Sequence, residues 1–391
     1  DVVSDPEHPR LVGAVSDAGP LTGASSVAVS GSSQLAFVAS DGSVAVVSVA
    51  IGSAPVVVGT LPLPSLVSGA TSSVAYDPST SRLLVSIGAS SSLAIVDVSD
   101  PGQPALASTF VDTLVLDGAS GVVYDVETGR AVVASEQAGS VAVVCVPQPV
   151  VAVCGSSLSV LGSSSEADLD GARAVAYDPA RQLVLGASGS AGSWSVVSLA
   201  APAAPTVVGS VSSAQLAGAH GVAYDASGQL AFVPSEDTDS LVVVSVADPA
   251  NPVVVGVLED AGALRGASAA VYDGATDRVY VACAGASSVA VVDVSTASSP
   301  SLVGVLVDEV SLAGAAGIAY DAASQHVVVA CAGGGGAVGG VAVVDVVSDP
   351  EHPRLVGAVS DAGPLTGASS VAVSGSSQLA FVASDGSVAV V

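Results

Sequence analysis

Three features of the sequence predict an all-β fold: a tandem repeat, short valine-rich runs and the absence of a helical period. The dipeptide Gly-Ala recurs at spacings of 46, 49, 53, 47, 48, 48 and 53 residues. Between these dipeptides, Val-rich runs alternate with Gly, Asp, Ser and Pro, which is typical of strands and turns because β-branched side chains fit a pleated sheet. No segment keeps apolar residues at the 3.6-residue period of a helix. The dipeptides begin at Gly23, Gly69, Gly118, Gly171, Gly218, Gly266, Gly314 and Gly367.

Each repeat contains four predicted strands in a fixed order. The first follows Gly-Ala and ends in six copies on Tyr-Asp, as at Tyr224-Asp225. A polar turn leads to the second strand, for example Val279–Cys283, and a Gly/Ser-rich turn leads to the third, for example Ser288–Val294. A proline-containing linker then introduces the fourth strand, such as Pro252–Gly256. Four strands in about 48 residues, repeated along the chain, are typical of the blades of a β-propeller.

We therefore expect a single domain, residues 1–391, in the form of an eight-bladed ring. A β-solenoid is the weaker alternative, because its coils are much shorter than this repeat. The chain opens with a strand of the fourth type, Arg10–Ser16, and ends on one of the third type, Ser387–Val391. Pairing of these two strands would complete the eighth blade and hide the exposed sheet edges. The alternative is a seven-bladed ring with the last repeat outside it.

Residues 345–391 repeat residues 1–47 without a single change, whereas the other repeats differ from one another at many positions. The identity reflects a recent duplication or engineering, or a longer array whose period is 344 residues (345 minus 1) and contains seven repeats. No Met precedes Asp1, and the first residues have the sequence of a linker between strands. We therefore expect the chain to come from a longer protein in which the seven-repeat unit recurs.

The segment Ser240–Gly256, SLVVVSVADPANPVVVG, resembles the LVIVD repeat, whose consensus runs from a VIVDVSDP strand through NP into LVG. Ser92–Pro104 and Val341–Gly357 match the same pattern, and Gly218–Asp225, GAHGVAYD, resembles the related YVTN-type repeats. The resemblance extends over essentially the whole chain. It implies a propeller with the Gly-Ala strand innermost and the LVG strand outermost, in a secreted or cell-surface protein. Such repeats indicate architecture and not a particular chemistry.

The charge pattern disfavours several classes of partner. The chain has eight Lys and Arg residues in total, all of them Arg, and a net charge of −27, so we expect it to bind neither nucleic acid nor an anionic lipid surface. Ser, Asp, Gly or Pro interrupts every apolar stretch, so we expect no membrane insertion. An acidic surface favours solubility, or attraction of cations and basic partners.

Two classes of acidic loop are predicted to share one face of the ring. One class precedes the innermost strands and the other joins the second strand to the third. Such a face would suit Ca²⁺, which binds several oxygen ligands, or a basic partner. No Asp-x-Asp-x-Asp-Gly loop is present, so solvated loops are the alternative. The candidates are Glu236, Asp237, Asp239, Glu259, Asp260, Asp308 and Glu309, with further carboxylates at Asp41, Asp112, Asp117, Glu136, Glu166, Asp168 and Asp170.

We expect no enzyme activity and no catalytic, metal or cofactor site. His220 begins an innermost strand, but the other repeats carry Ser, Thr, Arg or Ala at this position, so no set of metal ligands is expected. In the Tyr-Asp pairs, Asp is expected to cap a turn, and Tyr is expected to fill space between blades or to reach water with its hydroxyl. A Gly-x-Ser-x-Gly elbow is absent, and a phosphate loop is impossible without Lys. The enzymatic alternative is a propeller hydrolase or lactonase with a metal in the axial channel.

The four cysteines form two pairs with different expected states. Cys145 and Cys154 end and begin adjacent strands across a proline turn, so a hairpin disulfide is predicted, which fits an oxidising compartment. Cys283 and Cys331 occupy the same position in neighbouring blades, where equivalent side chains point the same way around the ring. They are expected to be buried free thiols. O-linked glycosylation is the only kind that the sequence allows, because Asn251 precedes Pro and no Asn-x-Ser/Thr site is present.

The function expected from these features is a structural or protein-interaction scaffold of an extracellular or cell-surface assembly, such as one unit of a repetitive filament. Its partners would be copies of itself or other surface or filament proteins. The alternative is a soluble ligand-binding propeller with an acidic, cation-binding face. A filament unit should self-associate through the edges of its blades, whereas a ligand binder should stay monomeric and have a formed axial pocket.

Overall fold

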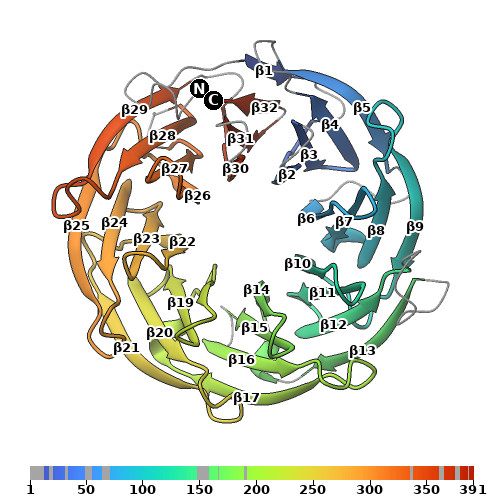
Figure 1. Cartoon of the computed structure of the whole chain (residues 1–391), viewed down its shortest axis with the longest axis horizontal. Helices are drawn as coiled ribbons and strands as arrows, with labels where there is room; N and C mark the ends of the chain where they lie inside the picture. Colours follow the sequence, from blue (N-terminus) through green and yellow to red (C-terminus); the bar gives the residue numbers. More distant parts are fainter. Residues whose placement is uncertain are drawn as a thin grey trace.

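A computed structural model shows the chain folded into a ring of eight four-stranded antiparallel sheets, each of which is one blade of a β-propeller (Figure 1). The fold is all-β, as predicted. The structure describes residues 13–16, 21–30, 34–48, 55–63, 71–147, 158–165, 167–188, 192–334, 338–360, 365–374, 379–385 and 387–391.

The first four blades are built from consecutive strands. Blade 1 consists of β2 (Ser26–Ser30), β3 (Leu35–Ser40), β4 (Ser43–Ser48) and β5 (Val56–Pro62). Blade 2 consists of β6 (Thr71–Asp77), β7 (Arg82–Ile87), β8 (Ser92–Asp97) and β9 (Ala105–Val111). Blade 3 consists of β10 (Ala119–Asp125), β11 (Arg130–Ser135), β12 (Ser140–Cys145) and β13 (Ser159–Ser165). Blade 4 consists of β14 (Ala172–Asp178), β15 (Leu183–Ser188), β16 (Ser193–Ser198) and β17 (Thr206–Ser212).

The last four blades follow the same order, except that blade 8 combines both ends of the chain. Blade 5 consists of β18 (Ala223–Asp225), β19 (Leu230–Ser235), β20 (Ser240–Ser245) and β21 (Val253–Glu259). Blade 6 consists of β22 (Ala267–Asp273), β23 (Arg278–Cys283), β24 (Ser288–Asp293) and β25 (Ser301–Val307). Blade 7 consists of β26 (Ala315–Asp321), β27 (His326–Cys331), β28 (Gly340–Asp345) and β29 (Arg354–Ser360). Blade 8 consists of β30 (Ser370–Ser374), β31 (Leu379–Ser384), β32 (Ser387–Val390) and β1 (Gly13–Ser16).

Helical structure in the described part of the chain is limited to three single 3-10 turns: η1 (Gly88–Ser90), η2 (Ala167–Leu169) and η3 (Ala214–Leu216). None of the helices in this part is long and apolar enough to cross a membrane.

The ring closes through the strands from the two ends of the chain, which meet at blade 8 (Figure 1). β1 pairs antiparallel with β32, from Gly13 opposite Val390 to Ser16 opposite Ser387. This confirms the predicted eight-bladed closure, and the closed ring is not the seven-bladed alternative. Residues 10–12 of the predicted closing strand lie outside the described residues. Closure leaves no blade without its outermost strand.

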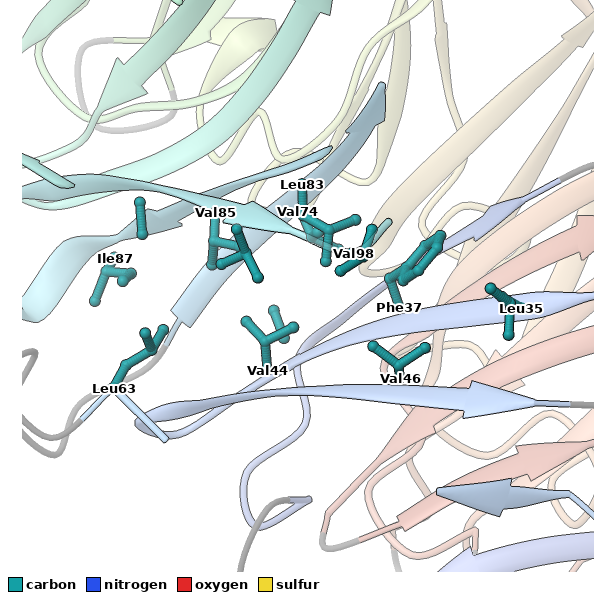
Figure 2. Packing of buried hydrophobic residues seen from close by; sticks show 13 residues of the cluster. Leu35, Phe37, Val44, Val46, Leu63, Val74, Leu83, Val85, Ile87 and Val98 are labelled. Atoms are coloured by element: carbon teal, nitrogen blue, oxygen red, sulfur yellow. The ribbon is translucent and has the colours of Figure 1, made fainter. Parts of the chain in front are cut away.

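The core lies between blades, which explains why the middle strands are almost continuously apolar. Every residue of β3 is buried, whereas the outermost strand β21 has one buried residue and is otherwise partly or fully exposed. Between blades 1 and 2, Phe37 and Val46 face Val74 and Leu83 across the interface (Figure 2). A neighbouring blade covers each face of a middle strand, so both sets of alternating side chains are apolar.

Among the described residues, a glycine in the outermost strand allows five of the blades to contact the linker of the next blade closely. A Cβ on Gly256 of β21 would lie 2.1 Å from the carbonyl oxygen of Ala297 and 2.7 Å from Cδ of Pro300 in the blade 6 linker. This glycine also lies beside a β-bulge, because β20 skips one residue of β21 between Val254 and Gly256. Gly59, Gly162, Gly209 and Gly304 make the same close approach in other blades.

The Gly-Ala dipeptides join the innermost strands to the loops between the second and third strands. Gly218 has a φ of +70°, in the left-handed region that favours glycine. A Cβ there would lie 2.7 Å from the backbone nitrogen of Asp237. The backbone N–H of Glu236 donates to the carbonyl of Gly218 over 3.0 Å. The same bond to the glycine carbonyl recurs at Gly118, Gly266 and Gly314, so the Gly-Ala dipeptide makes one tight backbone contact in blades 3, 5, 6 and 7.

Candidate functional site

The loops divide the ring into two faces. The upper face, as we call it, consists of the loops that lead into the innermost strands and the loops between the second and third strands. The lower face consists of the turns between the first and second strands and the linkers that precede the outermost strands. Every predicted acidic candidate that the structure describes belongs to the upper face by its place between strands. Glu166 lies outside the described residues.

The acidic candidates of blades 5 and 6 are brought together on the upper face. Glu236, Asp237 and Asp239 follow β19, and the backbone N–H of Asp260 donates to the carbonyl of Asp239 over 3.0 Å. The carboxylate of Asp239 also accepts the N–H of Gly266, at 2.9 Å, so it ties its loop to the next blade. Asp308 and Glu309 lie in the corresponding loop one blade further along the ring and are not part of this group.

Some of these carboxylates have structural tasks that the sequence analysis did not assign. Asp260 accepts the backbone N–H groups of Gly262 and Ala263, both at 2.9 Å. Asp308 accepts those of Val310 and Ser311 in the same way, at 2.9 and 2.8 Å. Both are Asx turns at the entry to an innermost strand. The missed signal was positional: each Asp directly follows the outermost strand.

Other upper-face carboxylates remain exposed to solvent. The residues Asp41, Asp237, Glu259 and Glu309 are exposed, and their carboxylates accept no hydrogen bond from the described residues. Arg265, one of the few cationic groups on this face, donates from Nε to the carbonyl of Gly285 at 2.8 Å. Little positive charge therefore opposes the carboxylates, and the upper face has a negative potential.

His220 and Arg173 form an ion-pair network at the start of the innermost strands. The Arg173 guanidinium donates from Nε and Nη2 to one oxygen of Glu136, at 2.9 and 2.6 Å. Nε2 of His220 lies 2.8 Å from Oε2 of Glu236 and 3.5 Å from Nη1 of Arg173. Since Nε2 donates to the carboxylate, it does not also accept from arginine. Arg173 of blade 4 is therefore paired with Glu136 of blade 3, and His220 is bonded to Glu236 within blade 5.

The innermost strands line an axial cavity of about 330 Å³. Its wall is formed by Ser73, Ser120, Gly121, Val122, Arg173, Ala174, Val175 and Val222. Within the described ranges, no three His, Cys, Asp or Glu side chains are grouped so that they could hold a metal ion. The cavity thus provides small apolar groups, hydroxyls and one arginine that is already paired, and no nucleophile next to a base.

The lower face carries a belt of Tyr-Asp bonds between blades. The hydroxyl of Tyr177 in blade 4 donates to Asp125 of blade 3 at 2.8 Å, and that of Tyr224 in blade 5 donates to Asp178 of blade 4 at 2.7 Å. The Tyr320 hydroxyl makes the same contact with Asp273 at 3.2 Å, whereas the Tyr272 hydroxyl lies 2.9 Å from Asp277 of its own blade and 3.4 Å from Asp225 of blade 5. The predicted position of tyrosine between blades is therefore confirmed, with the hydroxyl bonded to the neighbouring blade.

The aspartates of the belt also cap the turns that they begin, as predicted. Asp125 accepts the hydroxyl of Thr128 at 2.6 Å and the backbone N–H of Glu127 at 3.0 Å. Burial alone would raise the pKa of Asp125, but the hydrogen bonds from Thr128, Tyr177 and the turn backbone outweigh it and lower the pKa. On the donor side, burial and the bond to Asp178 raise the pKa of Tyr224 to about 12.

Two arginines of the lower face extend the contacts between blades. Nη1 of Arg82 in blade 2 donates to the carbonyl of Pro147 in blade 3 at 2.7 Å. Nη2 of Arg181 in blade 4 donates to the carbonyl of Val246 in blade 5 at 2.6 Å. Arg82 and Arg181 therefore bond within the ring.

The cysteines fall into the two expected classes. Cys283 and Cys331 are free and buried, and burial raises the pKa of each thiol to about 12. These thiols therefore pack as small apolar groups. Cys145 is buried and disulfide-bonded, and its predicted partner Cys154 lies outside the described residues.

A comparison with protein families agrees with this geometry. The family described as LVIVD repeat matches residues 87–112, 277–308 and 337–361. The chain contains LVIVD repeats. Each matched segment spans a third strand, its linker and an outermost strand, in blades 2, 6 and 7. The matched segments therefore include the linkers that the glycines of the preceding blades approach: Gly59 lies against Pro101, Gly256 against Ala297 and Gly304 against Pro350.

Solved structures share the fold at low sequence identity. The crystal structure of Saccharomyces cerevisiae Sqt1 is 11% identical, with a TM-score of 0.74 over 98% of each chain. The C-terminal WD40 domain of Sif2 is 13% identical, with a TM-score of 0.68, over 98% of this chain and 99% of that domain. A sequence search of curated proteins finds no match. These likenesses establish the propeller architecture alone.

Proposed function

We propose that this propeller is a protein-interaction scaffold that binds a basic partner on its upper face. The observation that carries the proposal is that four exposed upper-face carboxylates accept no hydrogen bond from the described residues: those of Asp41 in blade 1, Asp237 and Glu259 in blade 5, and Glu309 between blades 6 and 7. Carboxylates of the lower face, such as Asp125 and those at equivalent positions, are instead used inside the ring. Exposed like charges on a rigid frame attract and orient an oppositely charged surface.

The proposed setting is an extracellular or cell-surface assembly. A disulfide at Cys145 supports an oxidising compartment, because disulfides persist mainly in secreted and surface proteins. We favour a basic partner over Ca²⁺ at the upper face, since the described carboxylates form no group able to hold a metal. Enzyme activity finds no support in the axial cavity, which places no nucleophile beside a base.

The binding proposal is tested with a labelled oligolysine peptide and fluorescence anisotropy. One variant combines Asp41→Asn, Asp237→Asn, Glu259→Gln and Glu309→Gln on the upper face. We expect it to bind at least about tenfold more weakly than the wild type at low salt, with a smaller salt dependence.

The matched control removes the same number of charges from exposed lower-face positions, with Asp100→Asn, Glu127→Gln, Asp349→Asn and Glu351→Gln. We expect this variant to bind almost as tightly as the wild type. If both variants lose affinity equally, the peptide senses net charge only and the upper face is not a binding site.

Self-association as a filament unit is a second candidate function, supported by the outer rim. Val253 begins β21 and is 49% exposed, and Val307 ends β25 and is 55% exposed. Apolar side chains on the outermost strands favour contact between copies, while the net charge of −27 opposes it. We therefore expect association to increase with salt in analytical ultracentrifugation and to be reduced by Val253→Lys with Val307→Lys. A monomer at every salt concentration would exclude the filament role for this chain.

A further inference from the structure

The duplicated segment occupies two successive places in the ring. Residues 345–391 supply β29 to β32, and the identical residues 1–47 supply β1 to β4, except for the last residue of β4. The first three strands of blade 8 and of blade 1 therefore have the same sequence, and these two blades pack against each other where the chain ends meet (Figure 1).

Both copies present the same side chains toward the preceding blade. Blade 7 uses Val328, Ala330, Val341 and Val343 to pack against blade 8. The residues of blade 8 in this contact are Leu365, Ala368, Ala380, Val382, Ala389 and Val391. Blade 1 uses the identical residues, Leu21, Ala24, Ala36, Val38, Ala45 and Val47, to pack against blade 8. The surface that receives blade 7 is thus present a second time, on blade 1.

The same holds toward the following blade. Blade 1 packs against blade 2 through Leu35, Phe37, Ala39, Val44 and Val46. Blade 8 packs against blade 1 through Leu379, Phe381, Ala383, Val388 and Val390, which are the same residues in the second copy. The surface that receives blade 2 is thus present a second time, on blade 8.

The outermost strands are interchangeable as well. β28 pairs with β29 so that Val341 lies opposite Val359, and Val359 corresponds to Val15 of β1 in the duplicate. β4 pairs with β5 so that Val47 lies opposite Val57, and β4 is duplicated by β32. β28 can therefore accept β1, and β32 can accept β5, with the side-chain pairs that the present ring already contains.

We propose that the ring can close in two ways, with eight blades or with seven, because either copy of the duplicated segment fills the same place. In the seven-bladed state one copy is left outside, and blade 7 packs directly on blade 1, or blade 8 directly on blade 2. The contacts that the duplicated strands make at the new junction already exist elsewhere in the molecule, and rings of both sizes lie within the range that propellers adopt. This inference is independent of the partner proposed for the upper face.

A matched set of substitutions in the full chain tests the proposal. Val38, Val382 and Val281 are all fully buried and hold the same register position, opposite Ala45, Ala389 and Ala290. Val38 and Val382 lie in the two copies, whereas Val281 in blade 6 has no duplicate. Aspartate at any of these positions disables the blade that contains it. Trp194, fully buried in blade 4, reports through its emission whether the rest of the ring is intact.

We expect Val382→Asp and Val38→Asp each to give a monomer with buried Trp194 emission, in which limited proteolysis removes only the disabled copy. Val281→Asp, and Val38→Asp combined with Val382→Asp, should lose the folded ring. Misfolding of both single variants, or a folded double variant, would overturn the proposal.

A milder series keeps the test decisive if the aspartate variants cannot be recovered. Val382→Ala and Val38→Ala should shift the guanidinium midpoint of the Trp194 transition less than Val281→Ala does, because the seven-bladed ring remains available to the first two. Equal shifts for all three would overturn the proposal.

Discussion

The two faces of the ring use the same residue type for different purposes. On the lower face, Asp125 is buried and bonds to Tyr177 of the next blade and to its own turn. On the upper face, Asp237 is exposed and bonds to none of the described residues. The comparison shows that an acidic composition alone does not locate a binding surface. What separates the two groups is whether a neighbouring N–H or O–H donor is already directed at the carboxylate.

The difference also means that lower-face residues contribute to the stability of the ring, whereas the exposed upper-face residues can change without loss of stability. Lower-face contacts cross from blade to blade through Tyr-Asp bonds, arginine side chains and outermost-strand glycines, so a change there loosens a junction. The exposed upper-face carboxylates cross no junction, so they can be replaced without opening the ring. A binding surface formed by such loops can therefore change in sequence while the β-sheets of the ring keep their structure.

The largest effect on stability is expected where an outermost strand meets the next linker. In Gly256→Ala the new Cβ would lie 2.1 Å from a backbone oxygen, which forces the strand and linker apart. We expect a loss of about 3 kcal/mol in the free energy of unfolding, measured by guanidinium denaturation. Gly102→Ala is the control, because its nearest neighbour would be 3.4 Å away, an ordinary contact. Equal losses in both variants would show that the close approach does not matter.

The next largest effect is expected at the Tyr-Asp belt. Asp125→Ala leaves the Tyr177 hydroxyl, the Thr128 hydroxyl and turn N–H groups without their acceptor. We expect the free energy of unfolding to fall by roughly 2 to 3 kcal/mol. Tyr177→Phe removes one of these bonds and should cost less, about 1 kcal/mol. A loss in Tyr177→Phe as large as in Asp125→Ala would mean that the turn bonds contribute nothing.

Acid should weaken the lower face through Asp345. Burial alone would raise its pKa, but hydrogen bonds from Ser348, Val347 and Arg354 outweigh it and lower the pKa from 3.8 to about 2. A lowered folded-state pKa contributes stability above pH 4, and this contribution is lost as pH falls through about 2. The shift corresponds to about 2 kcal/mol. Urea midpoints between pH 5 and pH 2 should fall less steeply in Asp345→Asn than in the wild type, and parallel slopes would contradict the assignment.

The smallest effect is expected for the ion pairs at the mouth of the axial cavity. The Arg173 and Glu136 side chains are 41% and 35% exposed, and exposed pairs contribute little because water screens them. Arg173→Met should change the free energy of unfolding by no more than about 0.5 kcal/mol. A loss of more than about 2 kcal/mol in thermal or chemical denaturation would show that this network holds blades 3 and 4 together.

The sequence was sufficient to predict the fold, because recurring short motifs mark where the strands of each repeat begin and end. The Gly-Ala dipeptide, the Tyr-Asp turn and the LVG strand each correspond to one recurring contact. A strand of the fourth type at the start of the chain predicted the closure by β1. The bonds of Tyr177 and Tyr224 to the preceding blade were beyond the sequence, since spacing along the chain does not determine which side chains meet across a junction.

The candidate site was predictable in position but not in detail. The alternation of strands was enough to place Asp237 and Asp260 on one face. It did not separate the exposed carboxylate of Asp237 from that of Asp260, which accepts two backbone N–H groups. That distinction depends on how each loop turns. The pairing of His220 with Glu236 was missed for the same reason. His220 precedes β18 and Glu236 follows β19, so the conformation of two loops determines whether their side chains meet.

The most direct test of the division between the faces compares two triple variants with the same change in charge. One combines Asp125→Ala, Asp178→Ala and Asp273→Ala on the lower face, and the other combines Asp41→Ala, Asp237→Ala and Glu309→Ala on the upper face. Guanidinium unfolding is followed by the emission of the buried Trp194. We expect the lower-face variant to lose roughly 5 kcal/mol or fail to fold, and the upper-face variant to stay within about 0.5 kcal/mol of the wild type. Equal losses in the two variants would contradict the account.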